Sequence, residues 1–215
     1  KSKKGFPKFK NKNGRQSVTF TTFGYKLDGN KLTLAKCEKP LEIKLHRSLP
    51  KNSTLGNISI SKDPSGKYYV SFNCKYEISE DDKTDGKGIL GLDAGITNLY
   101  SLSDGTFIDN PKSFVNGQNK LAKVQRLHAR KKKGSKNKEK SRIKVAKLHE
   151  RIANIRKDYL HKLSTKLVSE NQALAIEDLQ VSNMSRNRKL AKHVMDAGWG
   201  MFRRFLEYKV HESQH

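Results

Sequence analysis

Two carboxylates stand at the ends of short apolar runs, where their type and position could support metal-dependent chemistry. Asp93 closes the run at residues 89–92, and Gly95 then lets the backbone turn. Glu177 closes a second run, residues 174–176, much later in the chain. Because short apolar runs bounded by turn residues are typical of buried strands, each acid is predicted to lie at a strand end.

A hairpin is predicted directly after the first of these strands. Residues 98–102 and 106–108 flank the dipeptide Asp104-Gly105, a strong hairpin signal between apolar runs. Two central strands that each end in an acid, with a hairpin after the first, indicate a ribonuclease H-like sheet, whose acids hold Mg²⁺ at one rim for phosphodiester hydrolysis. Either acid alone is better explained as an ordinary turn residue. The pair, with an intensely basic chain between its members, favours the metal site.

The overall charge indicates a polyanionic partner. The 215 residues carry 45 Lys and Arg against 21 Asp and Glu, a net charge of +24, and the pI is about 10.0. Nucleic acid is favoured over a membrane, because no stretch approaches the ~20 apolar residues of a span and no signal peptide is visible. A structural protein of the ribosomal or histone kind also fits the charge, although it does not explain two acids at strand ends.

The cysteines point to a reducing compartment. Cys37 and Cys74 lie far apart and form neither a Cys-x-x-Cys pair nor a disulfide framework. Cys74 alternates with Phe72 and Tyr76, which favours a packing role over metal ligation. The seven histidines are scattered without metal-ligand spacing.

The first residues are basic and include two aromatic side chains. Phe6 and Phe9 could stack on bases or anchor the segment, and anchoring is favoured. The sequence opens without a methionine, so we expect it to be the inside of a longer chain. The basic residues that we assign here to nucleic-acid binding are Lys3, Lys4, Lys8 and Lys10.

Residues 17–78 are predicted to form antiparallel strands of a small barrel or sandwich. Ile58 and Ile60 are expected to pair with residues 68–76 across a type I turn at residues 63–66, which has Asp, Pro and Gly at favourable positions. Nothing in this region suggests catalysis, so we expect a scaffold or nucleic-acid-binding role. The polar, glycine-containing residues 80–88 mark the predicted domain boundary.

A helical hairpin with a basic tip is predicted after the strands of the second domain. Apolar residues recur at helical spacing from Leu121 to Leu127 and again from Ile143 to Leu167, the second arm being near 30 residues, or ~45 Å. Between residues 120 and 157 the bases far outnumber the two acids, so we expect phosphate binding rather than mere solvation. The tip residues assigned to nucleic acid are Arg130, Lys131, Lys132, Lys133, Lys136 and Lys138.

The last part of the chain is predicted to be a basic loop and a helix. Residues 181–188 form the loop, whose Arg186 and Arg188 join the predicted nucleic-acid contacts. The helix is expected from about Trp199 to Tyr208, with Trp199 in the core rather than stacked on a base.

Five motifs together resemble one family, the transposon-encoded TnpB proteins, which are RNA-guided nucleases related to type V CRISPR effectors. The resemblance implies that Asp93 and Glu177 match the first two catalytic acids of a RuvC nuclease domain and hold Mg²⁺ in the intact protein. The matching stretches, in family order, are residues 5–10 (GFPKFK), 91–96 (GLDAGI), 156–162 (RKDYLHK), 176–179 (IEDL) and 196–200 (DAGWG).

The resemblance also implies the architecture and the partners. The expected fold is α+β, with a partial, wedge-like β-barrel domain at residues 1–85 that binds nucleic acid. A partial RuvC domain, a ribonuclease H-like α/β domain with a basic helical hairpin insertion, is expected at residues 86–215. The implied partners are a guide RNA of the omega type and target DNA, with no membrane, in the cytoplasm of a bacterium or archaeon. The sequence does not specify an oligomeric state.

Departures from the family pattern limit the implied activity. The zinc ribbon, and with it a Zn²⁺ site, and the third catalytic aspartate are not found in these 215 residues, so we expect a central fragment that cuts little or not at all. Asp178 is not a substitute, because its side chain should point away from that of Glu177, and Asp196 belongs to a different motif. Two functions stay open: part of an RNA-guided DNA endonuclease, or a nuclease-inactive RNA- or DNA-binding regulator derived from one.

Overall fold

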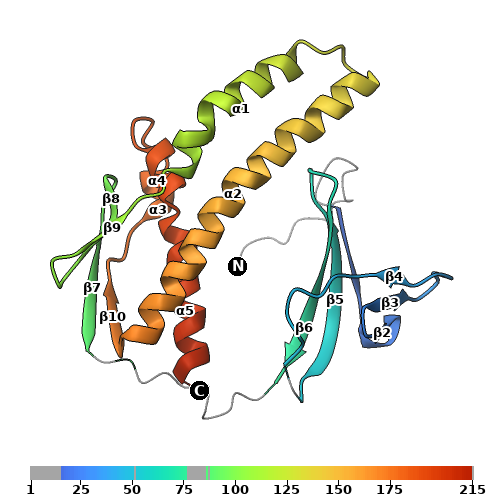
Figure 1. Ribbon diagram of the computed structural model, residues 1–215, viewed down its shortest axis with the longest axis horizontal. Coiled ribbons are helices and arrows are strands. Elements are labelled where there is room, and N and C mark those ends of the chain that lie inside the picture. Colours follow the sequence, from blue (N-terminus) through green and yellow to red (C-terminus); the bar gives the residue numbers. More distant parts are fainter. Residues whose placement is uncertain (1–15, 51, 77–85, 87, 215) are drawn as a thin grey trace, which may run out of the picture. The chain divides into compact units, whose positions relative to one another are not determined.

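The computed structural model describes residues 16–50, 52–76, 86 and 88–214, and these form a mixed α+β structure (Figure 1). The chain divides into two compact units, residues 1–77 and 78–215. Most of the predicted boundary at residues 80–88 lies outside the described residues, so its position stays a prediction. Within the described part of the chain, no helix is long and apolar enough to cross a bilayer.

The first unit contains two three-stranded antiparallel sheets. One has the order β1-β5-β6, formed by Gln16–Phe20, Thr54–Lys62 and Tyr68–Lys75. The other has the order β2-β3-β4, formed by Tyr25–Asp28, Lys31–Leu34 and Leu41–Glu42. A short 3₁₀ turn, Thr22–Gly24, carries the chain from the first sheet to the second.

A closed barrel, one of the two architectures predicted for this region, is not found in the described residues, because these two sheets do not join into one closed hydrogen-bonded sheet. They share a core instead: Leu32 and Leu34 of one sheet pack with Ile58 of the other. The β5–β6 register shifts between Leu55 and Ile58, and the Gly56 carbonyl within this bulge accepts a 2.7 Å hydrogen bond from the Tyr25 hydroxyl. Side chains therefore connect the two sheets where a barrel would need backbone ladders.

The pairing predicted within this unit is confirmed. Ile58 lies opposite Phe72 and Ile60 opposite Val70. The Gly66 amide donates to the Asp63 carbonyl at 2.9 Å, which closes the predicted turn.

The second unit is built on a four-stranded sheet of order β10-β7-β8-β9. β7 (Ile89–Ala94) pairs antiparallel with β8 (Asn98–Leu102), which pairs with β9 (Phe107–Asp109). The Asp104 carboxylate accepts from both the amide and the hydroxyl of Thr106, so the predicted hairpin turn is confirmed. β10 (Ala173–Ile176) runs parallel to β7 on its other side.

The helical hairpin is confirmed, with a longer second arm than predicted. α1 spans Ser113–Ala129 and α2 spans Lys136–Glu170, which is 35 residues or about 52 Å at 1.5 Å per residue. The helices lie side by side and are joined at the basic tip (Figure 1).

Two short helices and a long one complete the unit: α3 (Val181–Met184), α4 (Ala191–Ala197) and α5 (Trp199–Gln214). The prediction of a loop at residues 181–188 is partly wrong, because Val181 and Met184 pack against the core and wind the chain into α3. The last helix also runs past Tyr208, since Val210 continues the apolar spacing of Phe202 and Leu206.

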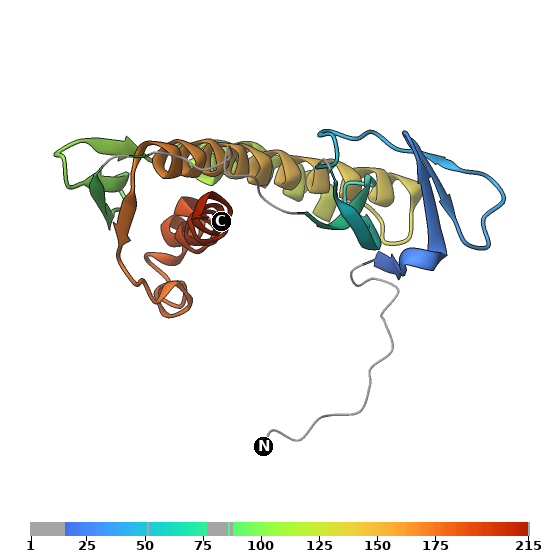
Figure 2. The same ribbon diagram turned by 90° about the horizontal axis from the view of Figure 1, so that it is seen from below.

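The core lies between the sheet and helices α2, α4 and α5. Leu90 and Leu92 of β7 pack with Leu160 of α2, Val194 of α4 and Phe202 of α5. Trp199 is only 3% exposed, so its predicted core position is confirmed. In both views α5 lies alongside α2 (Figures 1 and 2).

Asp196 holds the beginning of α1 from a distant helix. Its carboxylate is 3% exposed and accepts hydrogen bonds from the amides of Phe114 at 2.7 Å and Val115 at 3.1 Å. The residue before α1, Lys112, offers no side-chain cap. Asp196 therefore satisfies amides that a helix N-terminus otherwise leaves without a partner, and Arg156 lies 3.8 Å from the same carboxylate.

We expect Asp196→Ala to lower the free energy of unfolding by about 1.5–3 kcal/mol, because it removes hydrogen bonds to a buried charged acceptor. Denaturant unfolding followed by circular dichroism measures the change. The control is Asp158→Ala on α2, whose carboxylate is 64% exposed and, within the described residues, pairs with Lys162, so its loss should stay within about 0.5 kcal/mol. Equal losses in the two variants would contradict the capping role.

Candidate nuclease site and nucleic-acid interface

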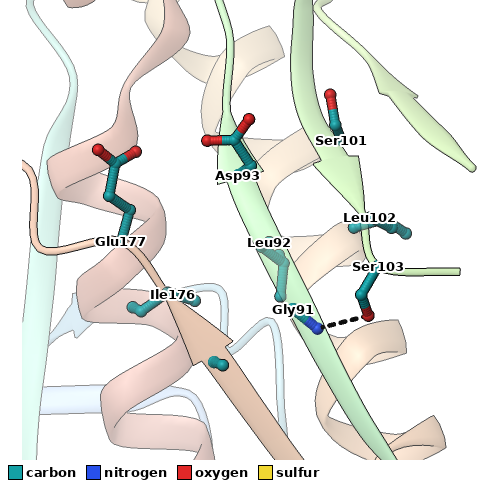
Figure 3. A pocket seen from close by; sticks show the side chains of 9 residues that line it. Gly91, Leu92, Asp93, Ser101, Leu102, Ser103, Ile176 and Glu177 are labelled. Carbon is teal, nitrogen blue, oxygen red and sulfur yellow. Dashed lines mark hydrogen bonds between the residues drawn. The ribbon is translucent and has the colours of Figure 1, made fainter. Parts of the chain in front are cut away.

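The parallel pairing of β7 and β10 brings Asp93 and Glu177 abreast. Leu92 lies opposite Ile176, so the next residue of each strand is the acid. Figure 3 shows the two side chains next to each other with their carboxylates pointing the same way. Both line a hollow of about 460 Å³. The structure thus places the two acids at one rim, as the strand pattern predicts.

Strand alternation explains why these acids are accessible. Leu90 and Leu92 face the core, so Gly91 and Asp93 lie on the opposite face of β7. Glu177 likewise follows the core-facing Ile176 and is exposed. Both acids are therefore exposed on the face of the sheet that points away from the core, and the pair forms without burying a carboxylate.

The rest of the hollow comes from β8 and the following turn. Ser101 lies opposite Asp93 in the antiparallel ladder. The Gly91 amide donates a 3.0 Å hydrogen bond to Ser103 Oγ (Figure 3), which ties this turn to β7. The hollow is therefore lined by the carboxylate pair, two serines and apolar residues of the strands, without a basic side chain.

The two carboxylates are electrostatically uncompensated. Among the residues that the structure describes, none donates a hydrogen bond to, or forms an ion pair with, the side chain of Asp93 or Glu177. Neighbouring anions repel each other, and a bound cation relieves that repulsion. Carboxylate oxygens are the ligands that Mg²⁺ prefers. The pair fits a divalent cation, although no cluster of three or more His, Cys, Asp or Glu placed for a metal occurs in the described ranges.

Asp178, next in the chain to Glu177, has a different role. Its carboxylate pairs with Arg203 of α5, and it does not line the hollow with the other two acids. This pairing ties the segment after β10 to α5. Asp178 therefore positions the backbone that carries Glu177.

Tyr100 is a neighbour of Glu177 that strand patterns do not single out. It is 5% exposed, and burial, followed by the negative charge of Glu177, raises the pKa of its hydroxyl. The phenol accordingly stays protonated at neutral pH and remains a hydrogen-bond donor. Tyr100 lies on β8, next to the strand that carries Asp93, and only the folded sheet shows that it is near Glu177.

The basic tip comprises residues between α1 and α2 and in the first turn of α2, and all but one of its predicted contacts are exposed. Ser135 caps α2 by accepting from the Lys138 amide at 3.1 Å. The Lys138 ammonium is half-buried and donates to the His128 carbonyl at 3.0 Å, so this lysine closes the tip and is not free to extend like its neighbours. The exposed members are Arg130, Lys131, Lys132, Lys133 and Lys136.

The other predicted basic contacts lie elsewhere. Arg186 and Arg188 are exposed between α3 and α4. The predicted residues Lys3, Lys4, Lys8 and Lys10 lie outside the described residues. The structure brings neither arginine into the carboxylate hollow.

Comparison with known proteins identifies the family. A family model described as a probable transposase, OrfB of IS605, matches residues 71–188, just over half of the chain. A protein of Streptomyces pristinaespiralis named "Putative RNA-guided DNA endonuclease" is 43% identical over 95% of this chain. The chain belongs to the TnpB family. A second relative, InsQ of Escherichia coli K12, carries the same description and is 35% identical over 95% of this chain.

This TnpB-family chain spans about half the length of the curated relatives it matches, 50% and 54% of the first two. Among solved structures, a Cas12f1–sgRNA–target DNA complex aligns over 92% of this chain and 48% of that chain. The TM-score is 0.49 and the sequence identity 12%.

We expect simultaneous Gln substitution of Lys131, Lys132 and Lys133 to weaken binding of RNA and DNA regardless of sequence. The plot of log affinity against log salt should flatten by about one for each phosphate that the variant no longer neutralises. Fluorescence anisotropy over a series of salt concentrations measures the slope.

The charge-matched control replaces Lys157, Lys162 and Lys166, which are exposed in the C-terminal half of α2. It removes the same number of positive charges away from the tip and should leave the slope nearly unchanged. If both triple variants flatten the slope equally, the tip acts only through the net charge of the chain.

Proposed function

We propose that this chain is part of an RNA-guided DNA endonuclease whose phosphodiester-cleaving site includes Asp93 and Glu177. One observation carries the proposal: two exposed carboxylates at the ends of parallel strands line one hollow, and neither has a side-chain partner among the residues that the structure describes. The names of the Streptomyces and Escherichia relatives support the same function. In this proposal the sheet of the second unit is the ribonuclease H-like core of a RuvC nuclease domain spanning residues 86–215.

Asp93 and Glu177 would hold Mg²⁺ between them. When bound, Mg²⁺ lowers the pKa of a coordinated water and neutralises charge on the phosphate oxygens. The carboxylates supply hard oxygen ligands, and the β7–β10 ladder fixes their spacing. Asp178 and Arg203 hold the backbone beside Glu177, and the hydroxyl of Ser101 lies opposite Asp93 as a neutral neighbour of the site.

The basic surfaces would hold the nucleic acids. The proposed partners are a guide RNA of the omega type and a target DNA, with the sequence chosen by base pairing and the protein holding the backbones. The residues of the basic tip would contact phosphates, and so would Arg186 and Arg188. The first unit, within the predicted domain at residues 1–85, would act as a wedge-like nucleic-acid-binding domain, and the protein would work in the cytoplasm of a bacterium or archaeon.

A second function is a regulator that binds RNA or DNA without cutting it. The exposed basic tip favours this alternative, because it can bind phosphates whether or not the acids hold a metal. The two functions differ in what the acid pair does. Metal binding and cleavage therefore distinguish them, whereas nucleic-acid affinity does not.

We expect the 215-residue chain to bind Mn²⁺, a spectroscopic substitute for Mg²⁺, at the acid pair. Asp93→Asn and Glu177→Gln should each weaken binding about tenfold or more, because loss of even an outer-shell partner costs that much. Electron paramagnetic resonance counts free Mn²⁺ during a titration. The control Glu170→Gln removes an exposed acid at the end of α2 and should change nothing. Equal Mn²⁺ binding by all four proteins would remove the acid pair as a metal site.

Cleavage is the second test of the nuclease proposal. Any Mg²⁺-dependent cutting of a matching DNA in the presence of guide RNA should disappear in Asp93→Asn, while the affinity for both nucleic acids is kept. The substitution is nearly isosteric and lies far in the chain from the basic tip, so binding should not depend on it. Cutting that persists undiminished in Asp93→Asn and in Glu177→Gln would show that other residues perform the hydrolysis.

A further inference from the structure

A second cavity, of about 270 Å³, adjoins the carboxylate hollow and shares Glu177 and Ile176 with it. Residues after β10 and at the beginning of α5 supply most of its other walls. Leu179 and Val181 form apolar surface, and Gln180 and Ser182 add polar groups. An apolar lining with a few polar groups is typical of a small-molecule or cofactor site, and this cavity has room for one small planar group.

Several hydrogen-bonding groups in this wall have no partner within the described residues. The buried indole N–H of Trp199 has none. The Gln180 amide does not cap α3, and no described residue bonds to it. Tyr100 is 5% exposed, its hydroxyl has no hydrogen-bond partner in the same part of the chain, and its raised pKa keeps it a donor. Three residues that line the cavity thus carry hydrogen-bonding groups without a partner in the described part of the chain.

The charges of the wall favour a neutral ligand over a phosphate. Glu177 contributes one negative charge. Arg203 contributes one positive charge, but its guanidinium is already paired with Asp178 and with Glu207, the latter at 2.8 Å. The three carboxylates outnumber the single arginine, so an additional anion would be repelled. A neutral heterocycle with hydrogen-bonding edges fits this environment.

Gly200 keeps the cavity open. It is the second residue of α5, and it lines the cavity. A Cβ built on Gly200 would meet no atom within 4 Å, so neither crowding nor a left-handed backbone requires glycine here. A larger side chain at this position would occupy the space.

We infer that this cavity binds an unpaired nucleobase of the DNA strand whose phosphodiester lies at Asp93 and Glu177. The inference rests on the proposed nuclease function for the identity of the strand. In a nucleic acid the base and the phosphate belong to the same or adjacent nucleotides, and the two cavities share the Glu177 wall. Binding the base beside the acids sets which phosphodiester is presented to them.

Trp199 is the single tryptophan of the chain, so its fluorescence reports on this wall. Without metal and with a chelator present, a single-stranded oligodeoxynucleotide should change the Trp199 emission. An abasic strand with the same number of phosphates should bind through the basic surfaces and leave the emission unchanged. Equal emission changes with the two strands would overturn the inference.

The matched variants are Gly200→Leu, which fills the cavity, and Gly200→Ala, which adds only a Cβ in open space. The measured quantity is the affinity for the base-bearing strand divided by that for the abasic strand. Gly200→Leu should lower this ratio about fivefold or more, the lower end of the effect of removing one bound base. Gly200→Ala should keep the wild-type ratio, and an unchanged ratio in Gly200→Leu would overturn the inference.

This experiment separates the cavity from the nuclease proposal, because no step requires Mg²⁺ or cleavage. If the base-bearing and abasic strands behaved alike while Mn²⁺ still bound, the base site would be excluded and the metal site would remain. If the two strands differed as expected but Mn²⁺ did not bind, the cavity would bind a base, and Asp93 and Glu177 would not form a nuclease site.

Discussion

The parallel pairing of β7 with β10 is the constraint on which the second unit depends. Parallel neighbours need a long connection that returns the chain to the starting edge of the sheet. Here the β8–β9 hairpin, α1 and α2 supply it, and the 35 residues of α2 carry the chain back to β10. Leu160, Leu167 and Val168 fasten the returning helix to the core. The connection between β7 and β10 therefore contains the basic helical hairpin and also brings the two acids together.

The same pairing reconciles a buried core with an exposed acid pair. Leu90 and Leu92 contribute to the core on one face of β7, so the alternate face can hold Asp93 without a desolvation cost. α5 covers the core face with Phe202 and Leu206, and its Arg203 holds Asp178. Glu177 is therefore restrained on both sides: β10 before it pairs with β7, and Asp178 after it pairs with Arg203 of α5.

The basic tip and the acid pair lie in different parts of this unit. The basic tip lies at the beginning of α2, whereas Asp93 and Glu177 lie at the ends of β7 and β10, and β10 follows the other end of this 35-residue helix. The tip can therefore attract a polyanion without neutralising Asp93 and Glu177. Lys138 contributes differently, because its bond to the His128 carbonyl stabilises the turn that presents the other bases.

Local signals in the sequence determined much of the second unit. Apolar runs that end in Asp93 and Glu177, the Asp104-Gly105 turn and the helical spacing around the basic run each depend on neighbouring residues. The strand ends, the hairpin and the helical hairpin could therefore be predicted without a structure. The strand pattern also predicted that the two acids act together, and the family motifs added the match to the catalytic acids of a RuvC domain and the expected RNA and DNA partners.

Contacts between residues distant in the chain were decided only by the tertiary structure. Asp196 caps α1 from 82 positions beyond Phe114 in the chain, and no capping signal next to Lys112 predicts this contact. The first unit forms two sheets joined through Tyr25 and Gly56, because side-chain packing and a bulge, rather than strand propensity, settle whether a barrel closes. The open space beside Gly200 exists only because α5 meets the segment after β10, and a sequence pattern does not encode where two such surfaces leave a gap.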